Sequence, residues 1–168
     1  MNNIIFTRRS VRKYLDKAVE PEKIDRMLRA AMQAPSATNQ QPWEFIVIDD
    51  RKTIDKLAEF SPYAKMLPQA PLAVVILEKQ GMRAALFTEQ DLGAAAQNMM
   101  LQAVEDSLGT VWMGVGRGSE RETFVTEMFS LPETVKPFGV FAVGYPAEEN
   151  ANKFVDRYDE NRIHWNKY

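Results

Sequence analysis

Residues 88 to 108, TEQDLGAAAQNMMLQAVEDSL, carry the strongest helix pattern in this chain. The apolar residues of this segment recur at i, i+3 and i+4 over several turns: Leu92, Ala95, Ala96, Met99, Met100, Ala103 and Val104. Residues 93–96 are all small, so another helix can approach this one closely. Two arrangements fit that pattern. One is a central helix crowded inside a single core, and the other is a helix packed against its own copy across a two-fold axis.

The segments on both sides of this helix predict further helices and strands. We expect helices at 20–34, at 51–60 and from a capping box of Ser119 and Glu122 onward, and strands at 43–49, 71–77, 110–115 and 138–145. A charged tail follows the last strand, and no linker or internal repeat interrupts the chain. Because helices and strands alternate irregularly, we predict a single α+β domain, residues 1–168, built in three layers.

Composition places the chain among globular proteins and excludes several kinds of chemistry. It has 168 residues, of which 45% are hydrophobic and 26% are charged, with a net charge of -2. That balance argues against a general nucleic-acid binder, which must neutralise many phosphates. The sequence has no cysteine and a single histidine, His164, so we expect no metal site and no thiolate nucleophile. No apolar run resembles a signal peptide or a membrane span, so we expect a cytoplasmic protein without a membrane partner.

A basic cluster near the N-terminus is the first candidate binding feature. Residues 8–12, RRSVR, bring three arginines and a serine hydroxyl together in a chain that is otherwise slightly acidic. Such a cluster is either a solvated surface or an anion site, because a guanidinium offers a planar fork of donors matched to phosphate oxygens. In the tail, Lys153 and Arg157 could close over the same anion. The pattern alone does not specify which phosphate is bound.

The second candidate is the loop APSATNQQPW at residues 34–43. Its small side chains and prolines would let the backbone approach a flat ligand. The amides of Asn39, Gln40 and Gln41 each offer a donor and an acceptor, which suits the edge of a heteroaromatic ring. The same composition is also compatible with a polar loop that only connects a helix to a strand.

The two stretches taken together resemble a known family. RRSVRKY, APSATNQQPWEF, AAAQNMMLQA and GTVWMGVG are similar to the FMN-dependent nitroreductase family in its short form. The similarity begins near residue 5 and extends to the closing segment DRYDENRIHWNKY. This resemblance implies a three-layer α/β/α fold with a central, mainly antiparallel sheet. It also implies an intertwined homodimer, with two FMN molecules at the subunit interface and the tail, about 150–168, packed on the dimer.

The resemblance also assigns roles to individual residues. It implies that four residues contact the FMN phosphate, ribityl chain and pyrimidine edge: Arg8, Arg9, Ser10 and Arg12. Contacts along the isoalloxazine from the other subunit fall to Pro35, Ser36, Ala37 and Asn39. A cation near flavin N1 and O2 is assigned to Lys65, and backbone groups near N5 and O4 to Met113, Gly114 and Val115. The C-terminal phosphate ligands match Lys153 and Arg157.

The activity implied by the resemblance is that of an FMN-dependent NAD(P)H oxidoreductase. NADH or NADPH would pass hydride to flavin N5, and a nitroaromatic, a quinone or a similar small acceptor would then take the same place, in ping-pong fashion. No protein side chain is expected to be catalytic, because the cofactor supplies the chemistry. Two alternatives stay open. One is a flavin-binding protein or redox sensor with little turnover, and the other is a relative with flavin-destructase or dehalogenase chemistry.

Two departures from the family pattern and one acidic residue complete the sequence picture. Ser107 stands where the family commonly has glycine. The segment at 78–91 is short, whereas larger members carry extra helices there, so the sequence leaves the acceptor open. Asp91 lies near the start of the long predicted helix, where we expect its charge to favour the helix dipole rather than to act as an acid.

Overall fold

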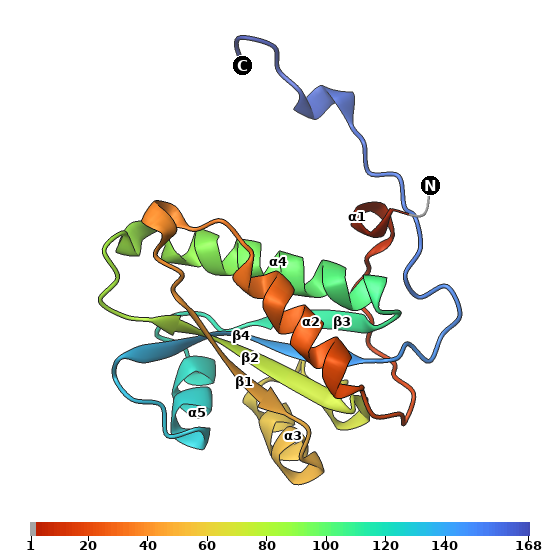
Figure 1. Cartoon of the computed structure of the whole chain (residues 1–168), viewed down its shortest axis with the longest axis vertical. Coiled ribbons are helices and arrows are strands. Elements are labelled where there is room, and N and C mark those ends of the chain that lie inside the picture. Colours follow the sequence, from red (N-terminus) through yellow and green to blue (C-terminus); the bar gives the residue numbers. More distant parts are fainter. Residues whose placement is uncertain (1–2) are drawn as a thin grey trace.

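A four-stranded antiparallel sheet forms the centre of the molecule (Figure 1). The computed structural model describes residues 3–168. The strands are β1 (Trp43–Ile48), β2 (Leu72–Lys79), β3 (Gly109–Gly114) and β4 (Val135–Gly144), arranged in the order β1-β2-β4-β3. Every neighbouring pair is antiparallel, and β2 pairs with β4 through a bulge at Ile76 and Leu77. The predicted antiparallel α+β sheet is therefore confirmed, with β3 at one edge.

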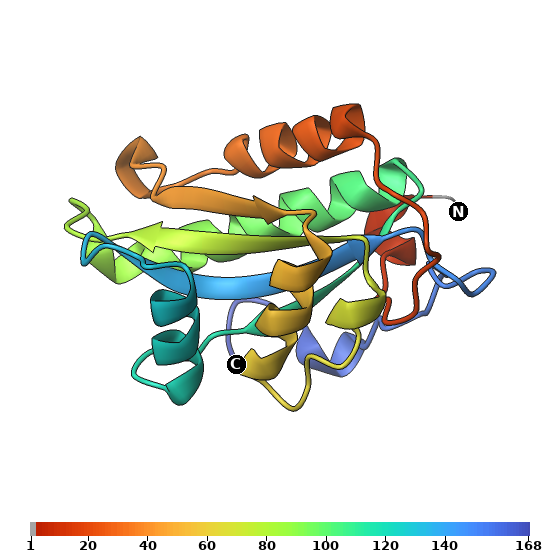
Figure 2. The same cartoon turned by 90° about the horizontal axis from the view of Figure 1, so that it is seen from below.

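Helices cover both faces of this sheet, which gives three layers (Figure 2). Helices α2 (Pro21–Met32) and α4 (Thr88–Glu105) lie on one face, and α3 (Arg51–Leu57) and α5 (Glu120–Met128) lie on the other. A short helix, α1 (Ile4–Thr7), lies beside α4. Five 3-10 turns occupy residues 37–39, 58–60, 67–69, 85–87 and 160–162. Among residues 3–168, no helix has both the length and the apolar character needed to cross a membrane.

Strand β2 joins the two halves of the hydrophobic core. Its side chains alternate between the faces, so Leu72, Val74 and Ile76 pack under α2 and α4. Ala73 and Val75 pack on the opposite face, toward α3 and α5. Burying a side chain such as Leu or Ile contributes about 1.5–3 kcal/mol. A continuously apolar strand is therefore required here, because neither face of β2 is in contact with water.

Helix α4 has one buried face and one uncovered face. The buried face packs on the sheet through residues that include Leu92, Ala95 and Met99, each fully buried. Gly93 lies on the other face, and a Cβ atom added there would meet no described atom within 4 Å. The crowded core predicted from the sequence is thus present on one side of α4. On the other side, a small-residue surface remains available to a second helix.

The last turn of α4 is closed by a reciprocal pair of backbone hydrogen bonds. Leu108 N–H donates to the Ala103 carbonyl at 2.7 Å, and Ser107 N–H donates to the Val104 carbonyl at 3.0 Å. This is a Schellman motif, which needs a left-handed residue just past the helix. Ser107 has φ +63°. The departure found in the sequence therefore falls at the position where glycine fits best, and the helix ends at Glu105 rather than at 108.

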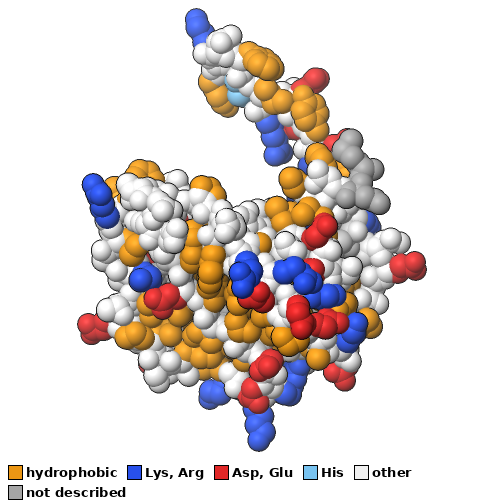
Figure 3. All heavy atoms as spheres, in the orientation of Figure 1, with side chains coloured by type: hydrophobic (Ala, Val, Ile, Leu, Met, Phe, Trp, Pro, Cys, Tyr) orange, Lys and Arg blue, Asp and Glu red, His pale blue; other side chains and the backbone are white. Residues whose placement is uncertain are grey.

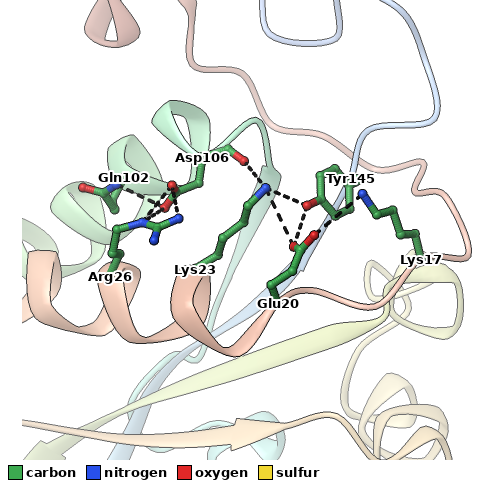
Figure 4. A network of polar contacts seen from close by, with 7 residues as sticks. All are labelled: Lys17, Glu20, Lys23, Arg26, Gln102, Asp106 and Tyr145. Atoms are coloured by element: carbon green, nitrogen blue, oxygen red, sulfur yellow. Dashed lines mark hydrogen bonds and ion pairs between the residues drawn. The ribbon is translucent and has the colours of Figure 1, made fainter.

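A polar network joins the start of α2 to the end of α4 (Figure 4). Arg26 donates to Asp106 through Nη2 at 2.7 Å and through Nε at 2.9 Å, and Gln102 donates to the same carboxylate at 3.1 Å. Lys23 donates to the Asp106 carbonyl at 3.0 Å and to the Tyr145 hydroxyl at 2.6 Å. Burial alone would raise the pKa of Asp106, but the hydrogen bonds from Arg26 and Gln102 outweigh it and lower that pKa.

After β4 the chain stays against the domain through about residue 158, and its last residues extend away from the body (Figure 3). Hydrophobic side chains project along them, and Trp165 is 84% exposed. The ring centroid of His164 lies 4.3 Å from that of Tyr168 in the same tail. This much apolar surface on the last residues is typical of a segment that packs on a partner.

Candidate functional site

The N-terminal segment lies against the free edge of β3. Val11 N–H donates to the Thr110 carbonyl at 2.9 Å, and Ser10 forms a parallel bridge with Thr110. A Cβ atom on Gly109 would lie 2.6 Å from the Val11 side chain, so glycine is needed for this approach. The segment is thereby held in an extended form, and the basic side chains of residues 8–12 project from the edge of the sheet.

An arginine-rich cavity of about 490 Å³ forms where the two ends of the chain meet. It is lined by Arg8 and Arg9 from the N-terminal segment and by Arg157 from the tail, with Phe6 and Phe154 at its apolar side, and Asp156 is the one acidic residue among its described lining. Partial burial lowers the pKa of Arg8, and the positive charges of Arg9 and Arg157 lower it further. None of the ion pairs found among residues 3–168 involves these three arginines. Such a cluster is strongly favourable for a multiply charged anion.

Arg9 has an unpaired donor in this cavity region. Its guanidinium donates to the carbonyls of Arg8 and Phe6, but its Nε is buried without a hydrogen-bond partner in the described chain. Its backbone N–H donates to Asn152 at 3.1 Å, and Asn152 in turn donates to the Leu108 carbonyl at 3.1 Å. An orphaned buried donor is uncommon in folded proteins and fits a missing acceptor such as a phosphate oxygen.

A second, larger cavity of about 750 Å³ borders β3. Its cations are Arg12, Lys65 and Arg121, and none of its lining residues in the described chain is acidic. Tyr63 and Trp112 supply aromatic walls. The ring of Trp112 also stacks on Phe141 at 5.4 Å between centroids, and it lies across Gly139, where a Cβ atom would approach its Nε1 to 2.5 Å. The cavity therefore combines positive charge with flat apolar surface.

Among Met113, Gly114 and Val115, which the resemblance assigns at the end of β3, Gly114 offers the most accessible backbone. Val115 N–H donates to the Phe138 carbonyl at 3.2 Å, so alternation along the strand turns the N–H and C=O of Gly114 away from β4. The side chains of Met113 and Val115 are buried in the core. A flat ligand at this edge would thus meet the backbone of Gly114 first.

Two of the assigned residues lie between or beside these cavities. Ser10 lines a small pocket of about 220 Å³ that it shares with Arg12, Lys13 and Glu148. Lys153 is exposed and is not among the residues that line the arginine cavity with Arg157. Its positive charge acts with Lys13 on Glu148, whose pKa is lowered first by the hydrogen bond from Lys13.

The loop at residues 35–41 has an unusual backbone. Thr38, Asn39 and Gln41 all have positive φ, at 52°, 54° and 48°. Left-handed conformations are rare for a β-branched residue, and they persist only when surrounding contacts impose them. Pro35 and Asn39 are exposed, while Ser36 and Ala37 are half-buried. The Ser36 hydroxyl accepts from Gln41 N–H at 3.0 Å.

Asp91 anchors this loop to α4. Its carboxylate is buried, with 5% of the residue exposed, and it accepts from Ala37 N–H at 2.9 Å and from the Gln40 amide at 2.7 Å. The Gln40 amide also exchanges hydrogen bonds with both backbone groups of Ala84. Gln40 therefore faces inward and cannot serve a ligand. Asp91 is in the first turn of α4, as expected, and it also shapes the loop.

The assigned residues fall into separate groups within one chain. The loop at 35–39 is tied to the first turn of α4, whereas Arg9 is linked through Asn152 to Leu108, just past its last turn (Figure 1). A helix of 18 residues is about 27 Å long. In the described chain, none of the three cavities above is lined by a residue of the 35–39 loop. Arg8 and Arg157 do come together, as the sequence analysis expected.

Several residues that shape these cavities lacked a signal in the sequence. Arg121 belongs to a helix with mixed charges, and nothing in its spacing distinguishes it from a solvated side chain. Tyr63 lies in an irregular segment, and Asn152 lies in the tail, 143 positions from the Arg9 backbone that it binds. The role of Asp91 in holding the loop was also not visible in the sequence, because the groups that it binds, Ala37 N–H and the Gln40 amide, belong to another segment.

Taken together, these features define an α+β domain with one arginine-rich cavity between the two ends of the chain and a second cationic cavity with aromatic walls beside the edge strand. Comparison with known proteins places it more narrowly. The sequence model described as "Nitroreductase family" matches residues 5–62 and 61–145. The chain belongs to the nitroreductase family.

Individual relatives agree with this assignment. The chain is 41% identical over 165 residues to a protein of Methanothermobacter thermautotrophicus, provisionally named an NADH dehydrogenase/NAD(P)H nitroreductase, covering 98% of this chain and 85% of the relative. A crystal structure from Clostridium acetobutylicum, described provisionally as an NADH oxidase, shares 54% identity with a TM-score of 0.94, covering 98% and 99% of the two chains. An FMN-dependent nitroreductase from Clostridium difficile R20291 shares 32% identity with a TM-score of 0.89 and full coverage of both chains.

Proposed function

We propose that this protein is an FMN-dependent NAD(P)H oxidoreductase that acts as a homodimer on small nitroaromatic, quinone or similar acceptors. The arginine cavity is the observation that carries the proposal. It gathers Arg8, Arg9 and Arg157 from both ends of the chain against a single acidic lining residue, Asp156, with which none of the three forms an ion pair among the described residues, and it leaves the Arg9 Nε unpaired. These are the properties that a bound phosphate monoester would satisfy. The FMN dependence named for the Clostridium difficile relative supports FMN as that ligand.

The residues around the second cavity fit the ring system of the same cofactor. Arg12 and Lys65 would place positive charge at the pyrimidine end of the ring, and Gly114 would bring backbone groups to its reactive edge. When bound, FMN supplies two-electron chemistry, because its N5 accepts a hydride from NADH or NADPH and the electrons then pass to the acceptor. The electron donor and the electron acceptor would bind one after the other in this cavity, which has no acidic residue in its described lining. We therefore expect ping-pong kinetics.

A second copy of the chain would complete the site. The loop at 35–39 lies too far along α4 to share a cavity with Arg12 in one chain, although the family resemblance assigns both to the flavin. The uncovered face of α4, centred on Gly93, offers a surface on which a second helix can pack. The tail beyond residue 150 exposes apolar side chains that would be buried by wrapping around a partner. We therefore propose that the loop, the α4 face and the tail together form the dimer interface.

Reduction of bound flavin tests this function directly. The protein, purified and incubated with FMN, is expected to retain a yellow flavin after gel filtration. NADH or NADPH added without oxygen is expected to bleach the flavin within seconds, and a nitroaromatic or quinone should restore the colour. A protein that takes up no FMN would overturn the proposal. A protein that binds FMN but bleaches only over many minutes would instead be a flavin carrier or sensor.

A further inference from the structure

We propose that Arg121, together with Tyr63, forms a subsite that binds an anionic substituent of the molecule reacting beside the flavin. The preferred ligand is the carboxylate of an aromatic acceptor. This inference rests on the proposed function, because it names the substrate class of the same cavity. It concerns a residue that the sequence comparison with the family did not single out.

Arg121 is a free cation aimed into the larger cavity. It lies in the first turn of α5, and none of the ion pairs found among residues 3–168 involves it. Its Nη1 donates to the Gly114 carbonyl at 3.4 Å, which is long for a hydrogen bond, so this contact is exchanged for a better acceptor at little cost. Two acidic residues flank it on α5: Glu122 accepts from Gly118 N–H and pairs with Lys136 at 3.8 Å, and Glu120 forms no ion pair with Arg121 among the described residues.

The position of Arg121 relative to β3 connects it with the reaction. Its contact with Gly114 puts the guanidinium beside the strand residue whose backbone faces the expected reactive edge of the ring. A small molecule stacked there would have a substituent within reach of Arg121. The guanidinium carbon also lies 5.6 Å from the ring centroid of Tyr63, which holds the side chain over the cavity by a cation–π contact.

The charge of the cavity also favours an anionic ligand. Three cations line it and no described lining residue is acidic. In the proposed function, the positive charges of Arg12 and Lys65 face the electron-rich pyrimidine end of the flavin. Arg121 comes from α5 and forms no ion pair among the described residues, so its charge stays unmatched. A bidentate carboxylate would supply the missing counter-charge and fix the orientation of the acceptor at the same time.

The walls of the cavity select for a flat molecule. Tyr63 is 72% exposed and Trp112 is 37% exposed, although both line the cavity beside Pro62 and Met66. Aromatic rings this accessible gain stability when a second ring packs on them. An aromatic acid therefore combines the two features that this wall offers, a ring surface and a fixed cation.

Stopped-flow measurement of the two half-reactions tests the subsite. The FMN-loaded protein is reduced, and its reoxidation is followed with 4-nitrobenzoate and with the neutral isostere 4-nitrobenzamide. Reduction by NADH and by NADPH is followed separately. The variants are Arg121→Gln, Arg121→Lys as the charge-conserving change, and Arg29→Gln as the control. Arg29 is an exposed helical arginine on α2 that pairs with Asp25 outside every cavity described above.

We expect Arg121→Gln to lower the second-order rate constant for 4-nitrobenzoate about tenfold and to leave 4-nitrobenzamide within about twofold of the wild type. Arg121→Lys should keep most of the discrimination, and Arg29→Gln should change neither rate. A loss confined to NADPH, with NADH unaffected, would assign the same anion site to the 2′-phosphate of the dinucleotide. Equal losses with both acceptors, or no loss in any arm, would overturn the inference. A wild-type protein that reduces no neutral acceptor would instead refute the proposed function.

Discussion

At the scale of single residues, the concentration of arginine in one cavity is the most distinctive feature of this molecule. Arg8, Arg9 and Arg157 converge although they come from opposite ends of the chain, and partial burial and the two neighbouring arginines lower the pKa of Arg8. Holding such a cluster together costs electrostatic free energy in the ligand-free protein. The cost is recovered when an anion binds, so stability and ligand affinity are linked at these positions.

The ring-side cation Arg12 provides a prediction at this scale. Arg12→Ala should weaken FMN binding about tenfold, because a positive charge near the pyrimidine end is lost. The two-electron potential of the bound flavin should also fall, by about 30 mV, since a positive neighbour stabilises the reduced state. Equilibrium titration and anaerobic potentiometry measure the two quantities. An affinity and a potential that both equal those of the wild type would contradict the assignment.

What the sequence could indicate about single residues depended on clustering. The arginines at 8–12 were found because three of them fall within five positions. Arg121 was not distinguished, and Asp91 was interpreted only as a charge favouring the helix dipole, because each is one charged residue on a helix and acquires its further role through a distant loop or strand. Asp91 gains two donors from residues 37 and 40, which no pattern along α4 encodes.

At the scale of elements, α4 is the part that the sequence described best. Its apolar period predicted both its existence and its buried face, because burial on a sheet imposes that period. Its end was predicted three residues too late. The apolar pattern continues through Leu108, but the chain leaves the helix at Ser107 in a left-handed turn. Helix α1 was missed altogether, since a single turn leaves no period to detect.

The polar network between α2 and α4 predicts how the stability of the protein depends on pH. The pKa of Asp106 is lowered in the folded protein, so its contribution to stability is complete above its unfolded pKa of about 3.9 and is lost as the pH falls through the lower folded pKa. Asp106→Asn should reduce the free energy of unfolding by about 1.5 kcal/mol at pH 7. The difference from the wild type should shrink as the pH falls from about 5 toward 2.

Urea unfolding at several pH values measures this effect. Glu127→Gln is a suitable control, because Glu127 is exposed on α5 and takes part in no ion pair within the described residues. The control should follow the wild-type pH profile. If the free energies of unfolding of Asp106→Asn and the wild type differed by the same amount at all pH values, the carboxylate charge would not be what stabilises the polar network between α2 and α4.

At the scale of the whole molecule, the three layers were predictable and the assembly was only implied. Alternating helices and strands constrain the layers, because each apolar face must be covered. The dimer was expected from the family resemblance, and one chain cannot display it. Two surfaces of the chain are consistent with such a dimer, because they are not covered within the described residues. They are the small-residue face of α4 and the exposed side chains of the tail, which include Trp165.

Gly93→Arg tests the proposed interface. In a single chain the new side chain meets open space, and replacing a helical glycine should stabilise α4 by up to about 1 kcal/mol. Between two closely packed helices the same side chain would force them apart. We therefore expect a monomer by sedimentation, with loss of bound FMN and no loss of thermal stability of the fold. Thr123→Arg, at an exposed position on α5, should remain dimeric and yellow.

The 35–39 loop is tied to the first turn of α4, whereas Arg9 is linked to Leu108 past its last turn, and this separation has a consequence for how the protein behaves on dilution. If only paired chains hold the cofactor, activity per milligram depends on concentration. The specific activity measured at nanomolar protein would then be lower than that measured at micromolar protein. Stock solutions would lose bound flavin when they are diluted. In the cell, the amount of protein made would determine how much of it works, without any separate regulator.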